Sequence, residues 1–455
     1  MPYSSLNPTT NQLIQTYPSW DDHHLQQALE KAHGAQKAWA QTSFARRAAV
    51  LRDTAIRLRA HPDRYSTLIT LEMGKPLREA RDEVEKCAVV CDYYAQHGED
   101  FLRADAVESD AGKSYVGYYP LGVVLAVMPW NFPFWQVFRA AAPALMAGNA
   151  LVLKHAANVP QCALAIEAVF RDSGLAEGLF TTLMIEVGQV ADAIASPHVH
   201  AVTLTGSEAA GRKVAASAGE NLKKCVLELG GSDPFIVLHD ADLELATDMA
   251  VASRFLNCGQ SCIAAKRFIV VPQIADEFLR RFKVKVEALR IGDPMDDATQ
   301  IGPLARPDLR ATLHQQVSDS IAQGALAVTG CGAVEREGFF YQPSILDRVT
   351  DKARAWHEEL FGPVAIVIRA ASEEDALRIA NETRFGLGSS IWSQDTARAE
   401  QLAAHIQAGC TFINGMVKSD PRLPFGGVKA SGYGRELSRL GIHEFVNAKT
   451  VWIRN

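Results

Sequence analysis

Hydrophobic and polar residues follow two different periods along this chain. Over residues 24–60 and 76–104, apolar residues recur at helical spacing among many Arg and Glu residues, which predicts amphipathic helices lying on a surface. From Ser114 to Met128 the pattern changes to that of β-strands, first a half-polar run and then the apolar run Val123–Met128. The chain is therefore expected to open with helices and to continue with strands.

Short apolar runs then alternate with helical segments. The first series consists of Ala150–Leu153, a helix over Gln161–Ser173, Phe180–Ile185, Ala201–Leu204 and a helix that begins at Glu208. The second series consists of Cys225–Glu228, Phe235–Leu238, a helix over Leu243–Asn257 and Phe268–Val271. This alternation is typical of parallel, doubly wound sheets and predicts an α/β protein whose second α/β unit begins near residue 230. The β-like run Thr450–Arg454 is expected to pair with a strand of this chain or of another subunit.

The composition narrows the functional classes. The chain has 455 residues, of which 48% are hydrophobic and 22% are charged, and its net charge is −6. This length and this hydrophobic content are enough for two or three domains with large cores. Acidic and basic residues are interleaved, so we do not expect nucleic acid as a partner. No apolar run is long enough to span a membrane and the first residues do not resemble a secretory signal, so we expect a cytoplasmic protein. The eight cysteines include no Cys-x-x-Cys pair, which favours reduced thiols over disulfides or a zinc site.

Two short segments carry candidate catalytic side chains. Cys262 ends the segment Gly259-Gln260-Ser261-Cys262 after a predicted helix, where a loop of small residues would give a thiolate access to a substrate. Taken alone, a buried structural cysteine is the more common case. Glu228 lies at a strand end between leucines and before Gly230-Gly231, where desolvation would raise its pKa toward that of a general base. An exposed turn glutamate would give the same pattern.

Two further segments follow predicted strands at their carboxyl ends, where parallel sheets bind ligands. In Pro129-Trp130-Asn131-Phe132-Pro133, two prolines restrict the backbone around Asn131, whose amide could donate to a developing oxyanion or cap a helix. In Thr205-Gly206-Ser207, backbone N–H groups at a helix start would suit a pyrophosphate, although an ordinary strand-to-helix turn has the same composition.

Together these segments resemble the aldehyde dehydrogenase superfamily from about Tyr118 to Val451. The other motifs that carry the resemblance are Leu153-Lys154, Glu359-Leu360-Phe361-Gly362-Pro363-Val364 and Pro424-Phe425-Gly426-Gly427-Val428-Lys429. The resemblance implies an α/β fold with a Rossmann-type cofactor-binding domain, an α/β catalytic domain and a β oligomerisation element. It places these at residues 1–103 and 120–229, at 230–432, and at 104–119 and 433–455, and it implies a homodimer or a homotetramer.

The resemblance also implies a role for each motif residue. Cys262 would attack the aldehyde, the Asn131 amide would stabilise the oxyanion, and Glu228 would activate the water that hydrolyses the thioester. The cofactor, NAD or NADP, would be bound by Trp130, Lys154, Gly206, Ser207, Leu229, Glu359 and Phe361.

One departure from the family pattern bears on the cofactor. Three residues after the lysine, members that prefer NAD⁺ typically carry a glutamate, but this chain has Ala157. The change removes repulsion against a 2′-phosphate, to which Lys154 and also His155 could offer positive charge. We therefore predict that NADP⁺ is used at least as well as NAD⁺.

Within the superfamily, the chain most resembles the bacterial succinate-semialdehyde dehydrogenases. Arg139 and Ser419, in the segment Lys418-Ser419-Asp420-Pro421-Arg422, would bind the carboxylate of a short ω-acid aldehyde, and Phe132, Trp135 and Phe425 would supply apolar walls. Leu256 stands where some relatives have a second arginine, so the chain length of the acid stays open.

The sequence alone also permits other interpretations of Arg139, of the substrate and of the reaction. Arg139 could be a surface arginine, the substrate could be another short aliphatic aldehyde, and a hydrolase or a CoA-acylating dehydrogenase would also use a thioester. The glutamate at position 228 weighs against the acylating enzymes, which usually lack it. Cys258 is not at the position of the cysteine that bridges to the nucleophile in some relatives, so redox regulation is not predicted.

Overall fold

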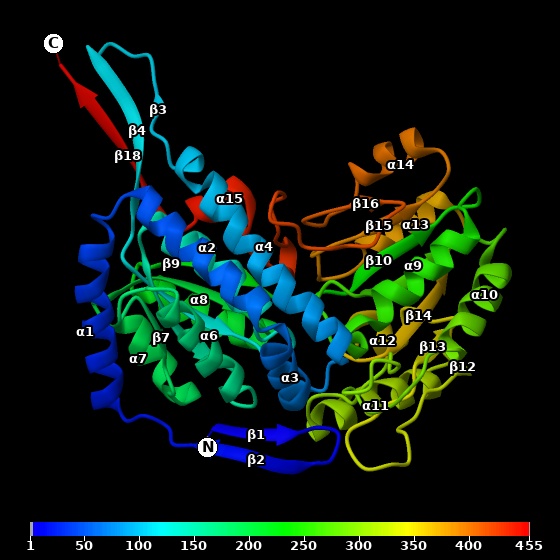
Figure 1. Ribbon diagram of the computed structural model, residues 1–455. Coiled ribbons are helices and arrows are strands. Elements are labelled where there is room, and N and C mark those ends of the chain that lie inside the picture. The colour runs from blue at the N-terminus through cyan, green and yellow to red at the C-terminus, as the bar shows by residue number, and fades with distance from the viewer. Residues whose placement is uncertain (1–2, 455) are drawn as a thin grey trace.

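The structure is a computed structural model that describes residues 3–454. It has two α/β lobes, each built on its own sheet, and a three-stranded arm that projects from the first lobe (Figure 1). The long helix α4 (Leu77–Phe101) crosses the molecule from the base of the arm toward the second lobe (Figure 1). The α/β fold predicted from the alternation of strands and helices is confirmed.

The chain opens with a hairpin that the hydrophobic pattern did not predict. Its strands, β1 (Tyr3–Asn7) and β2 (Gln12–Tyr17), are antiparallel and largely polar. The Tyr3 hydroxyl donates to the carbonyl of Ile185 at 2.7 Å, and the Ser4 N–H donates to the carbonyl of Ala157 at 3.1 Å. These contacts with distant segments attach the hairpin to the first lobe.

The predicted N-terminal helices are present and are divided by short turns. Asp21 and Ser43 cap the first two helices by accepting backbone N–H groups, as short polar side chains do at helix starts. The helices before α4 are α1 (Asp22–Trp39), α2 (Phe44–Ala60) and α3 (Pro62–Met73).

The first lobe is built on a six-stranded sheet in the order β17-β9-β8-β5-β6-β7. Only β17 is antiparallel, and the parallel strands are connected by helices, as a doubly wound sheet requires. The strands are β5 (Val123–Met128), β6 (Ala150–His155), β7 (Phe180–Thr182), β8 (Val199–Thr205), β9 (Lys224–Glu228) and β17 (Gly432–Tyr433). The helices are α5 (Trp135–Ala147), α6 (Pro160–Asp172), the 3₁₀ turn η1 (Val187–Gln189), α7 (Val190–Ala195) and α8 (Glu208–Glu220).

The second lobe is built on a seven-stranded sheet in the order β12-β13-β14-β11-β10-β15-β16, in which only β12 is antiparallel. The strands are β10 (Asp233–Val237), β11 (Ala265–Val270), β12 (Leu326–Thr329), β13 (Ser344–Asp347), β14 (Val364–Arg369), β15 (Ser390–Trp392) and β16 (Phe412–Ile413). The helices are α9 (Leu243–Phe255), α10 (Ala275–Glu287), α11 (Pro307–Ala322), α12 (Arg354–His357), α13 (Glu373–Asn381) and α14 (Thr396–Ala403).

The hydrophobic cores divide near the predicted start of the second unit. One core runs through the first lobe as far as Leu229 and later gains Ala305, Leu387 and residues between Phe425 and Val446. The two cores of the second lobe take up the chain at Phe235 and Ile236. At the predicted boundary at residue 432, the strand β17 begins at Gly432 and pairs with β9 of the first lobe. The chain therefore returns to the first sheet at Gly432, the last residue of the predicted catalytic segment.

The arm consists of β3 (Asp105–Ala106), β4 (Lys113–Pro120) and β18 (Val446–Ile453). The short helix α15 (Ser438–His443) precedes β18 in the chain. The predicted terminal strand pairs within the chain, antiparallel to β4, from Val446 opposite Pro120 to Ile453 opposite Lys113. Tyr119, Trp452 and Ile453 remain 44%, 49% and 45% exposed on it. No helix in residues 3–454 is long and apolar enough to cross a membrane.

The largest local difference from the predicted helices lies before Cys262. The predicted helix Leu243–Asn257 ends at Phe255, and the chain continues as the 3₁₀ turn η2 (Leu256–Gly259). Asn257 and Cys258 have φ angles of 55° and 54°, a left-handed conformation that apolar periodicity does not reveal. A second such turn, η3 (Lys429–Ser431), precedes β17.

Candidate active site

The strand ends of the first sheet bring several predicted site residues to one edge. β9, β8 and β5 are neighbours, so Glu228, Gly206 and Asn131 follow or end adjacent parallel strands. A cavity of about 390 Å³, here called the Trp130 cavity, lies over this edge. Its walls include all of the predicted cofactor residues except Lys154 and Ala157, together with two predicted catalytic residues: Trp130, Gly206, Ser207, Leu229, Glu359, Phe361, Asn131 and Cys262.

A second cavity of about 390 Å³, the Lys154 cavity, continues along the other side of α8. Lys154 lines it and donates to the carbonyl of His155 at 2.9 Å, and no carboxylate in residues 3–454 ion-pairs with it. Burial lowers the pKa of Lys154 to about 8. Ala157, at the exposed end of this segment, brings no acid to it.

The charge predicted for His155 is wrong. Its ring is buried and its Nε2 is hydrogen-bonded to the carbonyl of Pro133 at 2.9 Å. Burial lowers its pKa to about 4, so the ring is neutral near pH 7 and only Lys154 can offer positive charge here.

The start of α8 lies between these cavities. The Ser207 hydroxyl accepts the N–H of Ala210 at 3.3 Å, and Gly206 donates its own N–H to the carbonyl of Glu228 at 2.9 Å. The N–H groups of Glu208 and Ala209 find no acceptor among the described residues. These two first-turn N–H groups, rather than that of Gly206, are available to an anion.

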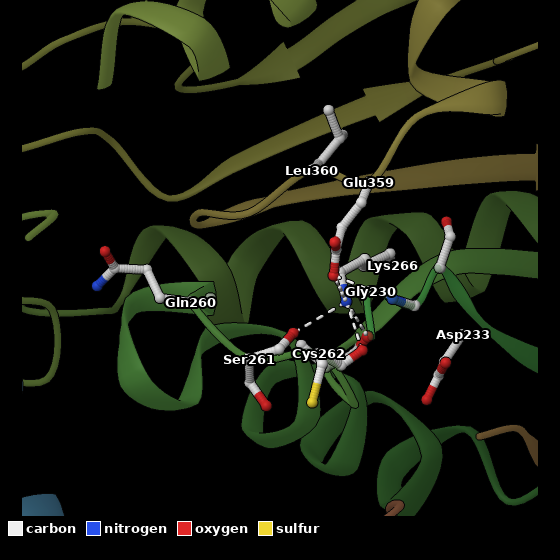
Figure 2. Close-up of polar contacts among 12 residues, drawn as sticks. Gly230, Asp233, Gln260, Ser261, Cys262, Lys266, Glu359 and Leu360 are labelled. Atoms are coloured by element: carbon white, nitrogen blue, oxygen red, sulfur yellow. Dashed lines mark hydrogen bonds and ion pairs between the residues drawn. The ribbon is translucent and has the colours of Figure 1, made fainter. Parts of the chain in front are cut away.

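Cys262 is held in a loop that Lys266 organises from β11. The Nζ atom of Lys266 donates to the carbonyls of Ser261 and Cys262 at 2.9 and 2.8 Å, and it ion-pairs with Glu359 at 3.3 Å (Figure 2). The Cys262 side chain points away from Lys266 (Figure 2). The backbone of the loop is therefore fixed while the sulfur stays free of these bonds.

Gly230 and Gly231, which follow Leu229, are required because other segments of the protein lie very close to their backbone. A Cβ atom on Gly231 would lie 2.7 Å from the carbonyl oxygen of Cys262, and one on Gly230 would collide with the carboxylate of Glu359. The N–H of Gly231 also donates to Glu359 at 3.1 Å. Only a chain without side chains at these positions lets the cysteine loop and Glu359 pack against the end of β9.

Two N–H groups beside the sulfur have hydrogens that are not used within the protein. The Asn131 amide donates one hydrogen to the carbonyl of Gln260 at 3.0 Å, and residues 3–454 provide no acceptor for the other. The backbone N–H of Cys262 likewise has no acceptor in the described chain. Asn257 fixes this arrangement by donating to the carbonyl of Asn131 at 2.8 Å.

The thiol and the nearby acid are both desolvated. Burial raises the pKa of Cys262 to about 12, against the lowering influence of Arg139 and Lys266. Burial, and then the charge of Glu436, raise the pKa of Glu228 well above its usual range. Neither carboxyl oxygen of Glu228 has a hydrogen-bond partner in residues 3–454, which is unusual for a buried acid and typical of a functional one.

The remaining predicted residues surround a narrow third cavity of about 80 Å³, here called the Lys86 cavity. Cys262 lines both this cavity and the Trp130 cavity, so this residue lies where the two spaces meet. Lys86, which belongs to none of the motifs, also lines this cavity. The predicted substrate residues on its walls are Phe132, Trp135, Arg139, Ser419 and Phe425.

Arg139 is already engaged within the protein. It forms a buried ion pair with Glu436, lies 4.7 Å from the centre of the Phe425 ring and donates to Thr205 at 3.3 Å. Its role in binding a substrate carboxylate stays a prediction, and Glu436 was not foreseen as its partner.

Two supporting residues were also missed. A signal for Lys266 existed, because Lys266 and Arg267 are adjacent cations in an otherwise apolar strand, which requires buried partners. Glu79, at the start of α4, accepts the N–H of the strained residue Asn257 at 2.7 Å, and nothing in its amphipathic helix marks it.

Cys258 is buried and accepts the N–H of Gly302 at 3.2 Å, and burial raises its pKa beyond any reactive range. All eight cysteines are free thiols. Among residues 3–454, no group of three His, Cys, Asp or Glu side chains is arranged to hold a metal ion.

Comparison with known proteins agrees with this geometry. The model of the aldehyde dehydrogenase family matches residues 1–451. A probable NADP⁺-type succinate-semialdehyde dehydrogenase from Synechocystis is 49% identical over 453 residues, covering 100% of both chains. An NAD(P)⁺-type succinate semialdehyde dehydrogenase from Escherichia coli is 47% identical over 448 residues, covering 98% of this chain and 97% of its own.

Among solved structures, succinic semialdehyde dehydrogenase from Streptococcus pyogenes in complex with NADP⁺ superposes with a TM-score of 0.98 at 40% identity, covering 100% of both chains. The family expected from the motifs is confirmed. The chain belongs to the aldehyde dehydrogenase family.

Proposed function

We propose that the protein oxidises succinate semialdehyde to succinate with NADP⁺ through a thioester on Cys262. The observation that carries the proposal is the position of Cys262, which lines both the narrow Lys86 cavity and the wider Trp130 cavity. A sulfur at this junction can hold a substrate on one side within reach of a cofactor on the other.

Cys262 is the nucleophile of the proposed reaction. Its thiol gives its proton to solvent water, the sulfur bonds to the aldehyde carbon, and the carbonyl oxygen becomes an oxyanion as the C=O π bond breaks. The free hydrogens of the Asn131 amide and of the Cys262 N–H then stabilise a charge that exists only after attack.

Glu228 is the base of the second half of the reaction. It removes a proton from a water that attacks the thioester, which releases the acid and restores the thiol. Its unpaired, desolvated carboxyl group suits this role, because a raised pKa makes it a stronger proton acceptor once it is ionised. A thioester with a base beside it favours hydrolysis over transfer to CoA.

The residues present fit a nicotinamide dinucleotide. The Trp130 cavity reaches Cys262, the first turn of α8 offers the N–H groups of Glu208 and Ala209 to phosphate, and the Lys154 cavity continues past it. A bound nicotinamide would supply the hydride acceptor for the carbon attached to sulfur. Glu359 lines the same cavity as Cys262, and Lys266 fixes its carboxylate.

NADP⁺ is favoured by the charges around Lys154. Its ammonium group has no acidic partner within residues 3–454, and Ala157 contributes no carboxylate that would repel a 2′-phosphate. The succinic semialdehyde dehydrogenase from Streptococcus pyogenes, which is 40% identical to this chain, has been solved in complex with NADP⁺.

The narrow cavity favours a short aldehyde. A volume of about 80 Å³ with Phe132, Trp135 and Phe425 on its walls favours a substrate of a few carbon atoms over a bulky one. The relatives from Synechocystis and Escherichia coli are named for succinate semialdehyde.

Reduced-cofactor absorbance tests the proposal directly. Succinate semialdehyde with NADP⁺ should give steady turnover that added CoA does not accelerate, and butyraldehyde should be a much poorer substrate. No reduction with any aldehyde would refute the activity, and a hundredfold preference for NAD⁺ would refute the cofactor assignment.

For assembly, we propose a homodimer or a homotetramer formed through the arm. The apolar side chains of Tyr119, Trp452 and Ile453 are about half exposed on its strands, and covering them would stabilise an association of subunits. Light scattering on the intact chain and on a Trp452→Glu variant tests this. A monomeric wild-type protein would refute it.

A further inference from the structure

The Lys86 cavity contains a cation that is not paired with an acid. The Nζ atom of Lys86 donates to the hydroxyl oxygen of Ser419 at 2.7 Å and lies 4.3 Å from the centre of the Trp135 ring. No carboxylate in residues 3–454 forms an ion pair with it. Because a desolvated ammonium group without a counter-ion is costly, the cavity favours an anion beside Lys86.

The nearest acids are bound to other groups. Glu83, one turn earlier on α4, ion-pairs with Lys75 and accepts two backbone N–H groups at the start of α5 at 2.9 and 3.0 Å. Asp420, next to the serine of the cavity, ion-pairs with Arg422 at 2.6 Å. Neither is free to move to Lys86 without leaving its own cation unpaired.

The Ser419 hydroxyl is oriented to donate. Its oxygen accepts from Lys86 at 2.7 Å and from the indole N–H of Trp135 at 3.1 Å, and these two bonds use both of its lone pairs. Its own hydrogen has no acceptor in the described part of the chain. An ammonium group and a hydroxyl hydrogen side by side match the two oxygens of one carboxylate.

Arg139, unlike Lys86, already has an acidic partner. Its guanidinium already pairs with Glu436, and both side chains are almost completely buried. Moving Arg139 to a substrate would leave Glu436 as an isolated buried charge close to Glu228, whose pKa Glu436 already raises. Lys86 can take an incoming carboxylate without such a loss.

We propose that Lys86, together with the hydroxyl of Ser419, binds the carboxylate of the substrate and selects ω-carboxy aldehydes over uncharged ones. This inference rests on the proposed function and adds the group that recognises the acid end. Lys86 and Cys262 line the same narrow cavity, so a short chain bonded to Cys262 keeps its other end in the space that Lys86 faces.

The charge of Lys86 is sensitive to pH. Burial, and then the positive charges of Arg139 and Lys75, lower its pKa to about 8, while the nearby Glu83 acts in the opposite direction. The neighbouring thiol of Cys87 is buried, which raises its pKa and keeps it neutral. Below about pH 8 Lys86 is charged and binds a carboxylate, and above it the charge and the binding are lost.

The test compares two substrates on matched variants. Lys86→Met removes the charge at nearly constant length, Lys86→Arg keeps it, and Arg78→Met removes an exposed cation from the same helix. For each protein, kcat and KM are measured with succinate semialdehyde and with butyraldehyde, which lacks the carboxylate. In Lys86→Met, the ratio of kcat/KM between the two substrates should fall on the order of 100-fold, mainly through KM. Lys86→Arg should retain most of the ratio, and Arg78→Met all of it.

The outcomes separate this inference from the proposed function. If the wild-type protein shows no preference for succinate semialdehyde, the proposed function fails. If the preference exists and survives Lys86→Met within threefold, while butyraldehyde turnover shows that the variant is folded, the role of Lys86 is refuted. A preference that survives Lys86→Met and disappears in Arg139→Met would assign carboxylate recognition to Arg139.

Discussion

The Trp130 cavity and the Lys86 cavity meet at Cys262 and are built from different kinds of groups. The Trp130 cavity is wide, its acid is fixed by Lys266, and the helix start at its edge offers backbone N–H groups to a ligand. The Lys86 cavity is narrow, and the ammonium group of Lys86 in it lacks an acidic partner within residues 3–454.

This difference separates two kinds of recognition. Backbone groups and a fixed acid suit a large cofactor that every catalytic cycle uses in the same way. A small space with a cation sorts substrates by size and by charge. Cys262 lines both cavities, so substitutions of Cys262 should abolish the whole reaction. Substitutions in the Trp130 cavity should mainly affect the cofactor, and those in the Lys86 cavity should mainly affect the substrate.

The largest effect is expected at the shared sulfur. Cys262→Ala should lower kcat by on the order of 10⁴-fold or more, because the sulfur that forms the proposed covalent intermediate is lost. Cys258→Ala is the matched control, since that thiol is buried four residues earlier and faces neither cavity. Steady-state rates and mass spectrometry of the acylated protein measure both. Aldehyde turnover by Cys262→Ala at the wild-type rate would falsify the whole mechanism.

The next largest effect is expected at Glu228, which acts in thioester hydrolysis, after the cofactor has been reduced. Glu228→Gln should lower kcat by about 10²-fold to 10⁴-fold, because the general base for the water is lost. A rapid burst of one reduced cofactor per site should remain, since thioester formation precedes hydrolysis. Stopped-flow absorbance distinguishes the phases, and loss of the burst together with the steady-state rate would place Glu228 in the first half-reaction.

Both of these residues were accessible from the sequence, whereas their electrostatic surroundings were not. Cys262, Glu228 and Asn131 stand in short motifs at strand ends or in a loop, where local pattern and neighbouring strand order decide their position. The pairing of Arg139 with Glu436 joins segments far apart in the chain, and no local pattern encodes such a contact. For the same reason Lys86 resembled an ordinary exposed lysine of an amphipathic helix.

The fold shows the same division. Apolar runs predicted the central strands, since burial on both faces requires them. The polar hairpin β1–β2 depends on contacts such as that of Tyr3 with Ile185, and the turn at Asn257 depends on Glu79 from another lobe, so periodicity could reveal neither.

On the cofactor side, Ala157→Glu should change the choice between the two dinucleotides. A carboxylate introduced near the 2′-phosphate should lower the ratio of kcat/KM for NADP⁺ over NAD⁺ by about 10-fold to 100-fold through like-charge repulsion. Ala157→Gln is the neutral control of similar size and should change the ratio much less. An unchanged ratio in Ala157→Glu would mean that the 2′-phosphate does not lie near this residue.

The smallest effect is expected from a change of pH. A higher pH should favour the chemical steps at Cys262 and Glu228 and weaken the binding of a carboxylate by Lys86. Burial raises the pKa values of Cys262 and Glu228, and both must lose a proton to act, so kcat should rise by up to about tenfold per pH unit above neutrality. The pKa of Lys86 is lowered to about 8, so KM for succinate semialdehyde should rise as pH passes through that value and the ammonium group loses its charge. KM for butyraldehyde, which has no carboxylate, should stay nearly constant over the same interval. Full pH profiles of kcat and KM for both aldehydes measure the difference, and parallel KM profiles would show that the narrow cavity does not use the charge of Lys86.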